Sequence, residues 1–226
     1  METRLNKFLA EKIGISRREA DDFIAKEKVL INGMPAKLGA RIKDGDEIVF
    51  DGKKIENAAP KYTYLMLNKP EGYVSSRKAQ GDAKTLYELL PEKYRGLKTV
   101  GRLDKNSSGL ILLTNDGDFA FSHTHPKFYK LKTYLITLDH ALEPLHQQEI
   151  SDFGIQLEDG PSKLFLSKLS EDRKEWQVEM SEGRNRQIRR TFAALGYEVI
   201  RLHRIEFGAY QLGDLKSGDF TEVDKK

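Results

Sequence analysis

One acidic residue, Asp104, lies in a short polar segment directly before a long apolar run. Polar side chains occupy residues 105–108, and residues 110–113 are uninterruptedly apolar. A buried strand is a rigid support for a reactive group, so this pattern favours a functional loop at the start of a strand. A lone carboxylate between Arg102 and Lys105 is expected to stay ionised, which suits a nucleophile or charge stabiliser better than an acid. The residues alone slightly favour the alternative, an aspartate that caps a turn or pairs with Arg102.

A second group is strongly basic and lies near the start of an expected helix over residues 187–195. Free backbone N–H groups at such a start favour anions, so the group suits a phosphate-rich ligand. The alternative is a solvated helix face, as for most charge runs. Because arginines in the first turns oppose the helix dipole, anion binding is favoured. The four side chains are Arg184, Arg186, Arg189 and Arg190.

A β-type run beginning at Lys132 places Lys132 and Tyr134 on the same face of a strand. Tyr134 is either a core residue or a flat surface on which a nucleobase stacks, a contact worth about 1–3 kcal/mol per base. No metal site is expected. Residues 115–118 have the composition of a turn. No third metal ligand lies at a suitable spacing from His123 and His125.

Composition limits the classes of protein that fit. The chain of 226 residues is long enough for one large domain, or for a small and a medium one. The absence of cysteine excludes disulfides, thiol nucleophiles and cysteine-based zinc sites. No apolar run approaches a membrane helix and no signal-peptide core opens the chain, so we expect a cytoplasmic protein without a membrane partner. The net charge of +3 means that a polyanion must meet a local basic patch.

Residues 1–59 are expected to form a small domain that precedes a larger one, residues 60–226. A helix over residues 4–14 is expected to stop at Gly14, and a second helix follows a capping box of Ser16 and Glu19. Short strands are expected at 29–31 and 48–50, with a tight turn at residues 32–33. Basic side chains are interleaved with acidic ones in this domain. Whether they form a nucleic-acid-binding face is left open by the sequence. The basic side chains at the two helix starts are Arg4, Lys7, Arg17 and Arg18.

The larger domain is expected to be α+β, with a mixed, mostly antiparallel sheet flanked by helices. Its pattern combines hairpins with long helical connections, which argues against regular βαβ winding. The expected strands cover residues 62–67, 110–113, 133–138, 164–169, 176–180 and 197–202, and the expected helices cover 85–90, 143–153 and 187–195.

Taken together, these segments resemble the pseudouridine synthases of the RsuA type, which act on ribosomal RNA, and the resemblance covers nearly the whole chain. The motif residues 101–104 with Gly109 and residues 114–117 match the catalytic motif of that family, and residues 68–72, 132–134 and 182–190 occur in the family's order. Residues 4 to about 50 resemble an S4-type RNA-binding domain. Ser107 stands where the family often has threonine, and Thr191 where methionine is common.

The resemblance implies that Asp104 is the nucleophile that attacks the target uridine, so that the base detaches, rotates and rejoins its ribose through carbon. Tyr134 would stack on the flipped base, and Arg189, with Arg190 beside it, would pair with the aspartate. The target base must leave the folded RNA, and the isomerisation needs no cofactor or metal. The RNA-binding residues would be Arg4, Lys7, Arg17, Arg18, Arg102, Lys132, Arg184, Arg186 and Arg190.

The implied partner is ribosomal RNA or a pre-ribosomal particle, bound by a monomer. A competing hypothesis is a non-catalytic RNA-binding or ribosome-assembly protein, because S4-type modules also occur in proteins without enzymatic activity. A hydrolase that uses Asp104 on a glycoside is a weaker third reading, since such enzymes generally need paired carboxylates.

Overall fold

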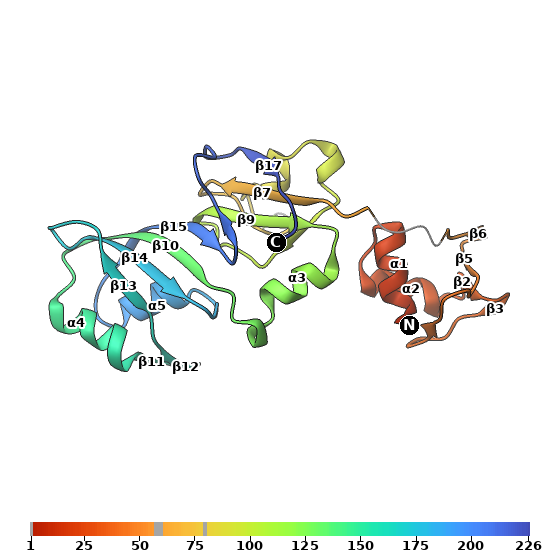
Figure 1. The fold of residues 1–226 in the computed structure, drawn as a ribbon, viewed down its shortest axis with the longest axis horizontal. Coiled ribbons are helices and arrows are strands. Elements are labelled where there is room, and N and C mark those ends of the chain that lie inside the picture. The colour runs from red at the N-terminus through yellow and green to blue at the C-terminus, as the bar shows by residue number, and fades with distance from the viewer. Residues whose placement is uncertain (1, 57–60, 79–80) are drawn as a thin grey trace. The chain divides into compact units, whose positions relative to one another are not determined.

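Two compact units make up the chain in the computed structural model, which describes residues 2–56, 61–78 and 81–226 (Figure 1). One unit comprises Met1–Thr63 with Asn115–Gly117, and the other comprises Tyr64–Thr114 with Asp118–Lys226. The domain boundary expected between residues 59 and 60 lies outside the described residues.

The small unit contains the expected helix pair. Helix α1 (Leu5–Ile13) ends at Gly14, whose left-handed φ of 77° is the conformation that glycine adopts without strain. Helix α2 (Arg17–Ala25) begins with the predicted capping box, in which Ser16 and Glu19 each accept the other's backbone N–H. Leu5, Leu9 and Ile24 are buried between the helices and the small sheets, so this unit has its own apolar core.

Short strands complete the small unit. The tight turn predicted at residues 32–33 joins β2 to β3, and both of its residues have positive φ. Four strands form one sheet in the order β3-β2-β5-β6, and β1 pairs with β4. The strands are β1 (Thr3–Arg4), β2 (Val29–Ile31), β3 (Met34–Pro35), β4 (Arg41–Ile42), β5 (Ile48–Phe50) and β6 (Lys53–Lys54).

A nine-stranded sheet organises the large unit. Its main order is β13-β14-β10-β15-β9-β7-β17, with β16 paired to β15 and β8 paired to β9. The β9–β15 pair is parallel and the other pairs are antiparallel, which confirms the predicted mixed, mostly antiparallel sheet. The strands are β7 (Tyr64–Lys69), β8 (Lys98–Val100), β9 (Ser108–Thr114), β10 (Lys132–Leu138), β13 (Phe165–Lys168), β14 (Glu175–Met180), β15 (Val199–Phe207), β16 (Tyr210–Gln211) and β17 (Phe220–Glu222), and the hairpin β11 (Ile155–Leu157) with β12 (Gly160–Ser162) lies outside this sheet.

Strand β9 is buried on both faces. Ile111 and Leu113 belong to one apolar core, and Leu110 and Leu112 belong to another on the opposite face. Alternate side chains of a strand point to opposite faces of the sheet, so a continuous apolar run is what a strand between two cores requires. The predicted buried strand behind Asp104 is therefore confirmed.

Helices cover both faces of the large sheet (Figure 1). Phe192 of α5 packs in the same core as Trp176 of β14, and Phe119 of α3 packs in the core on the other side of β9. The helical elements are α3 (Gly117–Thr124), α4 (Pro144–Gln148) with its π-helical continuation η4 (Glu149–Phe153), α5 (Gln187–Ala193), and the 3-10 turns η1 (Leu86–Leu89), η2 (Glu92–Tyr94) and η3 (Pro126–Phe128).

Three expectations need correction. The helix expected over residues 85–90 is only the 3-10 turn η1. Pro91 follows it and has no backbone N–H with which to continue an α-helical hydrogen-bond pattern. The strand expected over 62–67 is β7, two residues later, so Asn68 and Lys69, which lie beyond the expected end of the strand, are strand residues paired to β9. The strand expected over 197–202 is β15, which continues to Phe207.

Candidate active site

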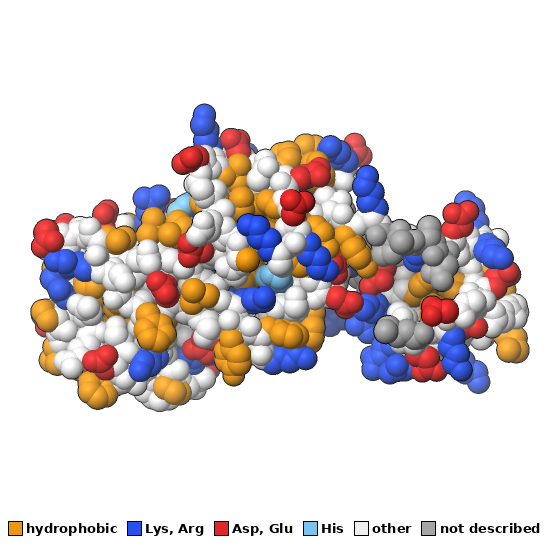
Figure 2. Space-filling model, in the orientation of Figure 1, with side chains coloured by type: hydrophobic (Ala, Val, Ile, Leu, Met, Phe, Trp, Pro, Cys, Tyr) orange, Lys and Arg blue, Asp and Glu red, His pale blue; other side chains and the backbone are white. Residues whose placement is uncertain are grey.

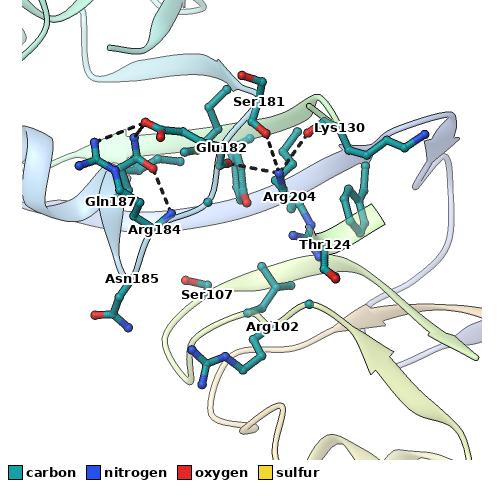
Figure 3. Close-up of a pocket in the computed structure, with 18 of the residues that line it drawn as sticks. Arg102, Ser107, Thr124, Lys130, Ser181, Glu182, Arg184, Asn185, Gln187 and Arg204 are labelled. Carbon is teal, nitrogen blue, oxygen red and sulfur yellow. Dashed lines mark hydrogen bonds and ion pairs between the residues drawn. The ribbon is translucent and has the colours of Figure 1, made fainter. Parts of the chain in front are cut away.

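A pocket of about 360 Å³ lies in the large unit, a size typical of sites for small organic groups. It is bounded by the Asp104 loop, defined here as residues 101–107, and by segments from α3, β10, β14 and β15. Figure 3 shows Arg102 entering from one side and Glu182, Arg184 and Gln187 from the other. Basic residues outnumber acidic ones among its lining residues, with Arg102, Lys130, Lys132, Arg184, Arg186 and Arg204 against Asp104 and Glu182.

Backbone contacts fix the Asp104 loop. The hydroxyl of Ser75 donates to Leu103 O at 2.7 Å and accepts from Leu103 N at 3.1 Å. Gly72 N donates to Lys105 O at 2.8 Å, and Ser107 N donates to Asp104 O at 3.1 Å, which closes a turn around the aspartate. The carboxylate is thus mounted on a loop held from both sides, directly before β9.

The carboxylate of Asp104 faces the pocket beside Arg186. Its Oδ2 lies 3.8 Å from Arg186 Nη1, and the two side chains are 36% and 46% exposed. Among the described residues, Arg186 is the one cation within ion-pair distance of Asp104. A half-exposed ion pair of this length is weak, so the carboxylate stays available to a ligand.

The guanidinium of Arg189 lies behind the Asp104 loop and is absent from the pocket lining among the described residues. Its Nη2 donates to Asn106 O at 2.6 Å, and its Nη1 donates to Val199 O. Burial and the nearby Arg186 charge lower the pKa of Arg189, and Asp104 and Glu71 partly oppose that shift. Arg189 therefore ties α5 to the loop that carries Asp104, and its field reaches the carboxylate without an ion pair.

Tyr134 and Lys132 both line the pocket, which confirms that they share a face of β10. Tyr134 is 8% exposed and also belongs to the apolar core, so the two interpretations of this residue are compatible. The Lys132 ammonium donates to the backbone oxygens of Lys130, Ser181 and Glu182. Burial and, to a smaller extent, the nearby Arg204 charge lower the pKa of Lys132 to about 8, and Glu182 partly opposes the shift.

Two arginines of the basic group pair with one aspartate. Asp159 Oδ1 lies 2.8 Å from Arg184 Nη1, and Asp159 Oδ2 lies 2.7 Å from Arg190 Nη2. Arg184 also donates to the carbonyls of Gly160 and Pro161. These contacts favour a structural role that fastens the start of α5 to the β11–β12 hairpin, in place of the phosphate contacts that the sequence analysis expected of both arginines and that the structure does not test.

Sequence analysis did not single out Arg204, which is 2% exposed and lines the pocket. It lies opposite Tyr134 across the β10–β15 ladder, and its Nε donates to Leu110 O at 2.7 Å. A usable signal was present, because Arg204 follows Leu202 at a strand spacing of two and so shares its buried face. The strand expected over residues 197–202 stops two residues before Arg204, so it does not include this residue.

In the small unit, Arg4 directly precedes α1, and Arg41 lies opposite it in the β1–β4 pair. Arg17 Nη2 donates to Asn6 Oδ1 at 3.3 Å, which brings the start of α2 near the start of α1. Lys7 lies 3.9 Å from Glu11, and Arg18 is exposed. On the face drawn in Figure 2, basic and acidic side chains are interleaved over this unit. Arg41, which lies beside Arg4 at the start of α1, is not among the basic residues expected from the sequence.

A basic pocket of this size, with one mounted carboxylate and an aromatic ring on its wall, fits an enzyme that acts on a nucleic acid. Residues 63–194 match the family model described as RNA pseudouridylate synthase, and residues 3–48 match the S4 domain. The chain belongs to the RNA pseudouridylate synthase family.

Individual relatives agree with this assignment. Ribosomal large subunit pseudouridine synthase B of Bacillus subtilis (strain 168) is 37% identical, over 97% of this chain and 91% of the relative. Ribosomal small subunit pseudouridine synthase A of Pasteurella multocida (strain Pm70) is 38% identical, over 97% and 95%. A crystal structure of a pseudouridylate synthase superposes with a TM-score of 0.70 at 35% identity and covers 98% of this chain and 96% of its own.

Proposed function

We propose that this protein converts specific uridines of ribosomal RNA to pseudouridine. The observation that carries the proposal is the position of Asp104, a carboxylate held on a fixed loop inside a basic pocket that Tyr134 also lines. The family assignment supports the reaction, and the names of the relatives, which act on either ribosomal subunit, support the class of RNA.

In the proposed mechanism, the target uridine turns out of the RNA and enters the pocket, since its glycosidic bond cannot be reached inside a stacked helix. Its ring stacks on Tyr134. Asp104 attacks as the nucleophile, the base detaches and rotates, and it rejoins the ribose through carbon. Arg189 positions the loop of Asp104 and keeps a positive charge behind the carboxylate.

Phosphates on both sides of the target nucleotide would lie along the pocket rim. Arg102 and Arg186 are the best placed for this role, because both line the pocket and are exposed. The small unit would add the contacts at its helix starts, through Arg4, Lys7, Arg17 and Arg18. We infer a monomer that works in the cytoplasm on ribosomal RNA or a pre-ribosomal particle without a cofactor. Among the described residues, no helix has the length and apolar character that a membrane crossing requires.

The replacement Asp104→Asn tests the proposal. It keeps the size of the side chain and removes the nucleophilic charge, so pseudouridine formation in transcripts of small- and large-subunit RNA should fall by at least about a thousandfold. Affinity for the same transcripts should remain within about threefold, because the rim arginines are unchanged. Pseudouridine is mapped by carbodiimide labelling and primer extension.

A matched control is Asp152→Asn, because Asp152 is an exposed carboxylate outside the pocket. This variant should retain full turnover. Ordinary turnover by Asp104→Asn would remove Asp104 from the mechanism. RNA binding by the unaltered protein with no pseudouridine in any ribosomal transcript or pre-ribosomal particle would instead indicate a non-catalytic RNA-binding protein.

A further inference from the structure

The guanidinium of Arg204 has unused hydrogen-bonding capacity at the pocket. Nε is the one nitrogen of this group with a hydrogen bond among the described residues, and Nη2 is buried without a partner. Buried polar groups are nearly always hydrogen-bonded, so an unpartnered donor on a pocket wall indicates a ligand that supplies the acceptor. The side chain as a whole is 2% exposed.

The charge of Arg204 is also unbalanced. No carboxylate among the described residues lies within ion-pair distance of it, and its neighbours are the rings of Tyr134 and Phe207, whose centroids lie 6.0 and 4.8 Å from Cζ. A second cation, Lys132, is close enough for Arg204 to lower its pKa. A buried charge without a counter-charge is costly, and a bound group that carries negative charge relieves that cost.

Chain geometry sets Arg204 firmly in place. Gly109 pairs with Arg204 in the parallel β9–β15 ladder, and a Cβ atom at Gly109 would lie 2.2 Å from Arg204 O. Ser107, two residues earlier on the same segment, is 2% exposed, lines the pocket, and has an Oγ without a partner. Figure 3 shows Ser107 and Arg204 projecting from these neighbouring segments of the pocket wall.

We propose that Arg204 is a catalytic residue that donates a hydrogen bond to a carbonyl oxygen of the target uracil and stabilises the negative charge of the detached base, with Ser107 as a second polar contact. This inference rests on the proposed uridine isomerisation.

Depth in the pocket favours the base over a phosphate as the ligand of Arg204. Arg102 and Arg186 are exposed and can meet the RNA backbone, whereas Arg204 is buried directly across the ladder from Tyr134. A base that stacks on this ring brings its edge, and not the phosphate of its nucleotide, toward the pocket floor.

The reaction itself generates the charge that Arg204 would hold. When the N1–C1′ bond breaks, its electron pair leaves with the base and spreads over N1 and the carbonyl oxygens, while Asp104 bonds to C1′. When C5 then bonds to C1′, the Asp104 carboxylate leaves, C5 loses a proton and N1 gains one. No oxidant, reductant or other reactant is consumed. A fixed donor aimed at developing charge stabilises the transition state more than the bound substrate.

The first test measures single-turnover rates of Arg204→Gln on a ribosomal transcript that the unaltered protein modifies. Loss of a preorganised donor to a developing anion should lower the rate by about 100-fold to 1000-fold, with transcript affinity within about threefold. The variant Arg204→Lys keeps the charge and loses the planar guanidinium donors, so its rate should lie between those of the unaltered protein and Arg204→Gln. A rate of Arg204→Gln within threefold of the unaltered protein would overturn the proposal.

A matched control is Arg173→Gln. Arg173 also donates through Nε to a backbone oxygen, Leu142 O, and lies over an aromatic ring, with Cζ 5.1 Å from the centroid of Trp176, but it is outside the pocket. This variant should lose stability and keep its rate. Equal rate losses in the two variants would assign the effect of Arg204 to folding alone and refute a substrate contact.

The second test does not depend on the folding of a variant. Once the modified uridine is mapped, synthetic RNA carries 2-thiouridine or 4-thiouridine at that position, because sulfur accepts hydrogen bonds poorly. One of the two substitutions should slow the unaltered protein at least tenfold. Equal rates of the unaltered protein on all three RNAs would refute the contact, although the proposed function would stand. If the unaltered protein does not convert ordinary uridine to pseudouridine in any ribosomal transcript, the proposed function itself is refuted.

Discussion

Four arginines that look alike in the sequence of residues 184–190 have different surroundings. Arg184 and Arg190 pair with Asp159, Arg189 donates to carbonyls behind the Asp104 loop, and Arg186 faces Asp104 in the pocket. Charge and spacing in the sequence identify this group of arginines. They do not identify the partner of each arginine, because Asp159 lies in the β11–β12 hairpin, a separate part of the chain. Proximity in three dimensions decides which cation is available to RNA.

A first prediction separates Arg186 from Arg190. Arg186→Gln should weaken RNA binding and reduce the slope of log affinity against log salt by about one, because one phosphate contact is lost. It should also slow turnover, since Arg186 is the ion-pair partner of Asp104. The matched variant Arg190→Gln should leave the slope unchanged. Filter-binding titrations at several salt concentrations measure both, and equal slopes for the two variants would contradict the assignment.

A second prediction concerns Lys69, which is fully buried and donates to the carbonyls of Pro70 and Tyr73. Burial lowers its pKa to about 8, although Glu71 and Asp104 oppose the shift. The unfolded chain, with an ordinary lysine pKa, binds more protons between about pH 8 and 10.5, so the contribution of Lys69 to stability should rise with pH across that window. Urea unfolding of the unaltered protein and Lys69→Met from pH 7 to 10 should show a widening difference. A constant difference would contradict the lowered pKa.

At the scale of elements, the pair β9–β15 joins the Asp104 loop to Arg204. These strands run parallel, and the register places Gly109 beside Arg204. Gly109 has a φ of 104°, and a Cβ there would lie 2.2 Å from Arg204 O and 2.6 Å from Arg204 N. Only glycine permits the two backbones to approach this closely.

The third prediction follows from this approach. Gly109→Ala should destabilise the protein by about 3 kcal/mol or more, because it adds a backbone clash to the strain of a positive φ. Gly213→Ala is a suitable comparison, since Gly213 also has a positive φ, 56°, with no atom within 4 Å of an added Cβ. It should cost only about 1 kcal/mol. Urea denaturation gives both values, and similar losses would show that the clash is relieved by a backbone shift.

The sequence predicts correctly the elements that depend on residues close together in the chain. The capping box at Ser16, the glycine stop at Gly14 and the apolar run of β9 required no knowledge of distant residues, and all three are confirmed. Strands such as β17 and the extension of β15 to Phe207 were missed, because their hydrogen bonds come from β7, β10 and β16, far away in sequence. The site residues divide in the same way. Asp104 and Tyr134 lie in recognisable motifs, whereas the sequence marks Arg204 only by its spacing of two from Leu202, and its burial beside the pocket is seen only in the structure.

At the scale of the whole molecule, the small and large units have separate apolar cores. The net charge of the chain is only +3, so RNA affinity must come from basic side chains grouped in space. In the small unit, Arg4 and Arg41 are cross-strand neighbours at the start of α1. Two like charges placed directly opposite each other disfavour the pair unless an anion lies between them.

The fourth prediction assigns affinity to the small unit and chemistry to the large one. The double variant Arg4→Gln/Arg41→Gln should reduce the salt slope of RNA binding by about two and raise KM, while kcat at saturating RNA stays within about twofold. The variant Lys26→Gln/Lys53→Gln has the same change in net charge on exposed residues away from β1 and β4, and it should bind nearly as well as the unaltered protein. A fall in kcat with unchanged KM would contradict this division.

The position of β9 in the sheet has a consequence for biosynthesis. Its neighbours β7 and β15 come from opposite ends of the large unit, and β17, near the C-terminus, pairs with β7 at the sheet edge. Pairings between such distant segments form slowly, and they require the late segments to have left the translating ribosome. The nascent chain can therefore complete the pocket only after residues 199–207, which supply Leu202, Arg204 and Phe207, have left the ribosomal exit tunnel, and a chain stalled before that point lacks this wall of the pocket.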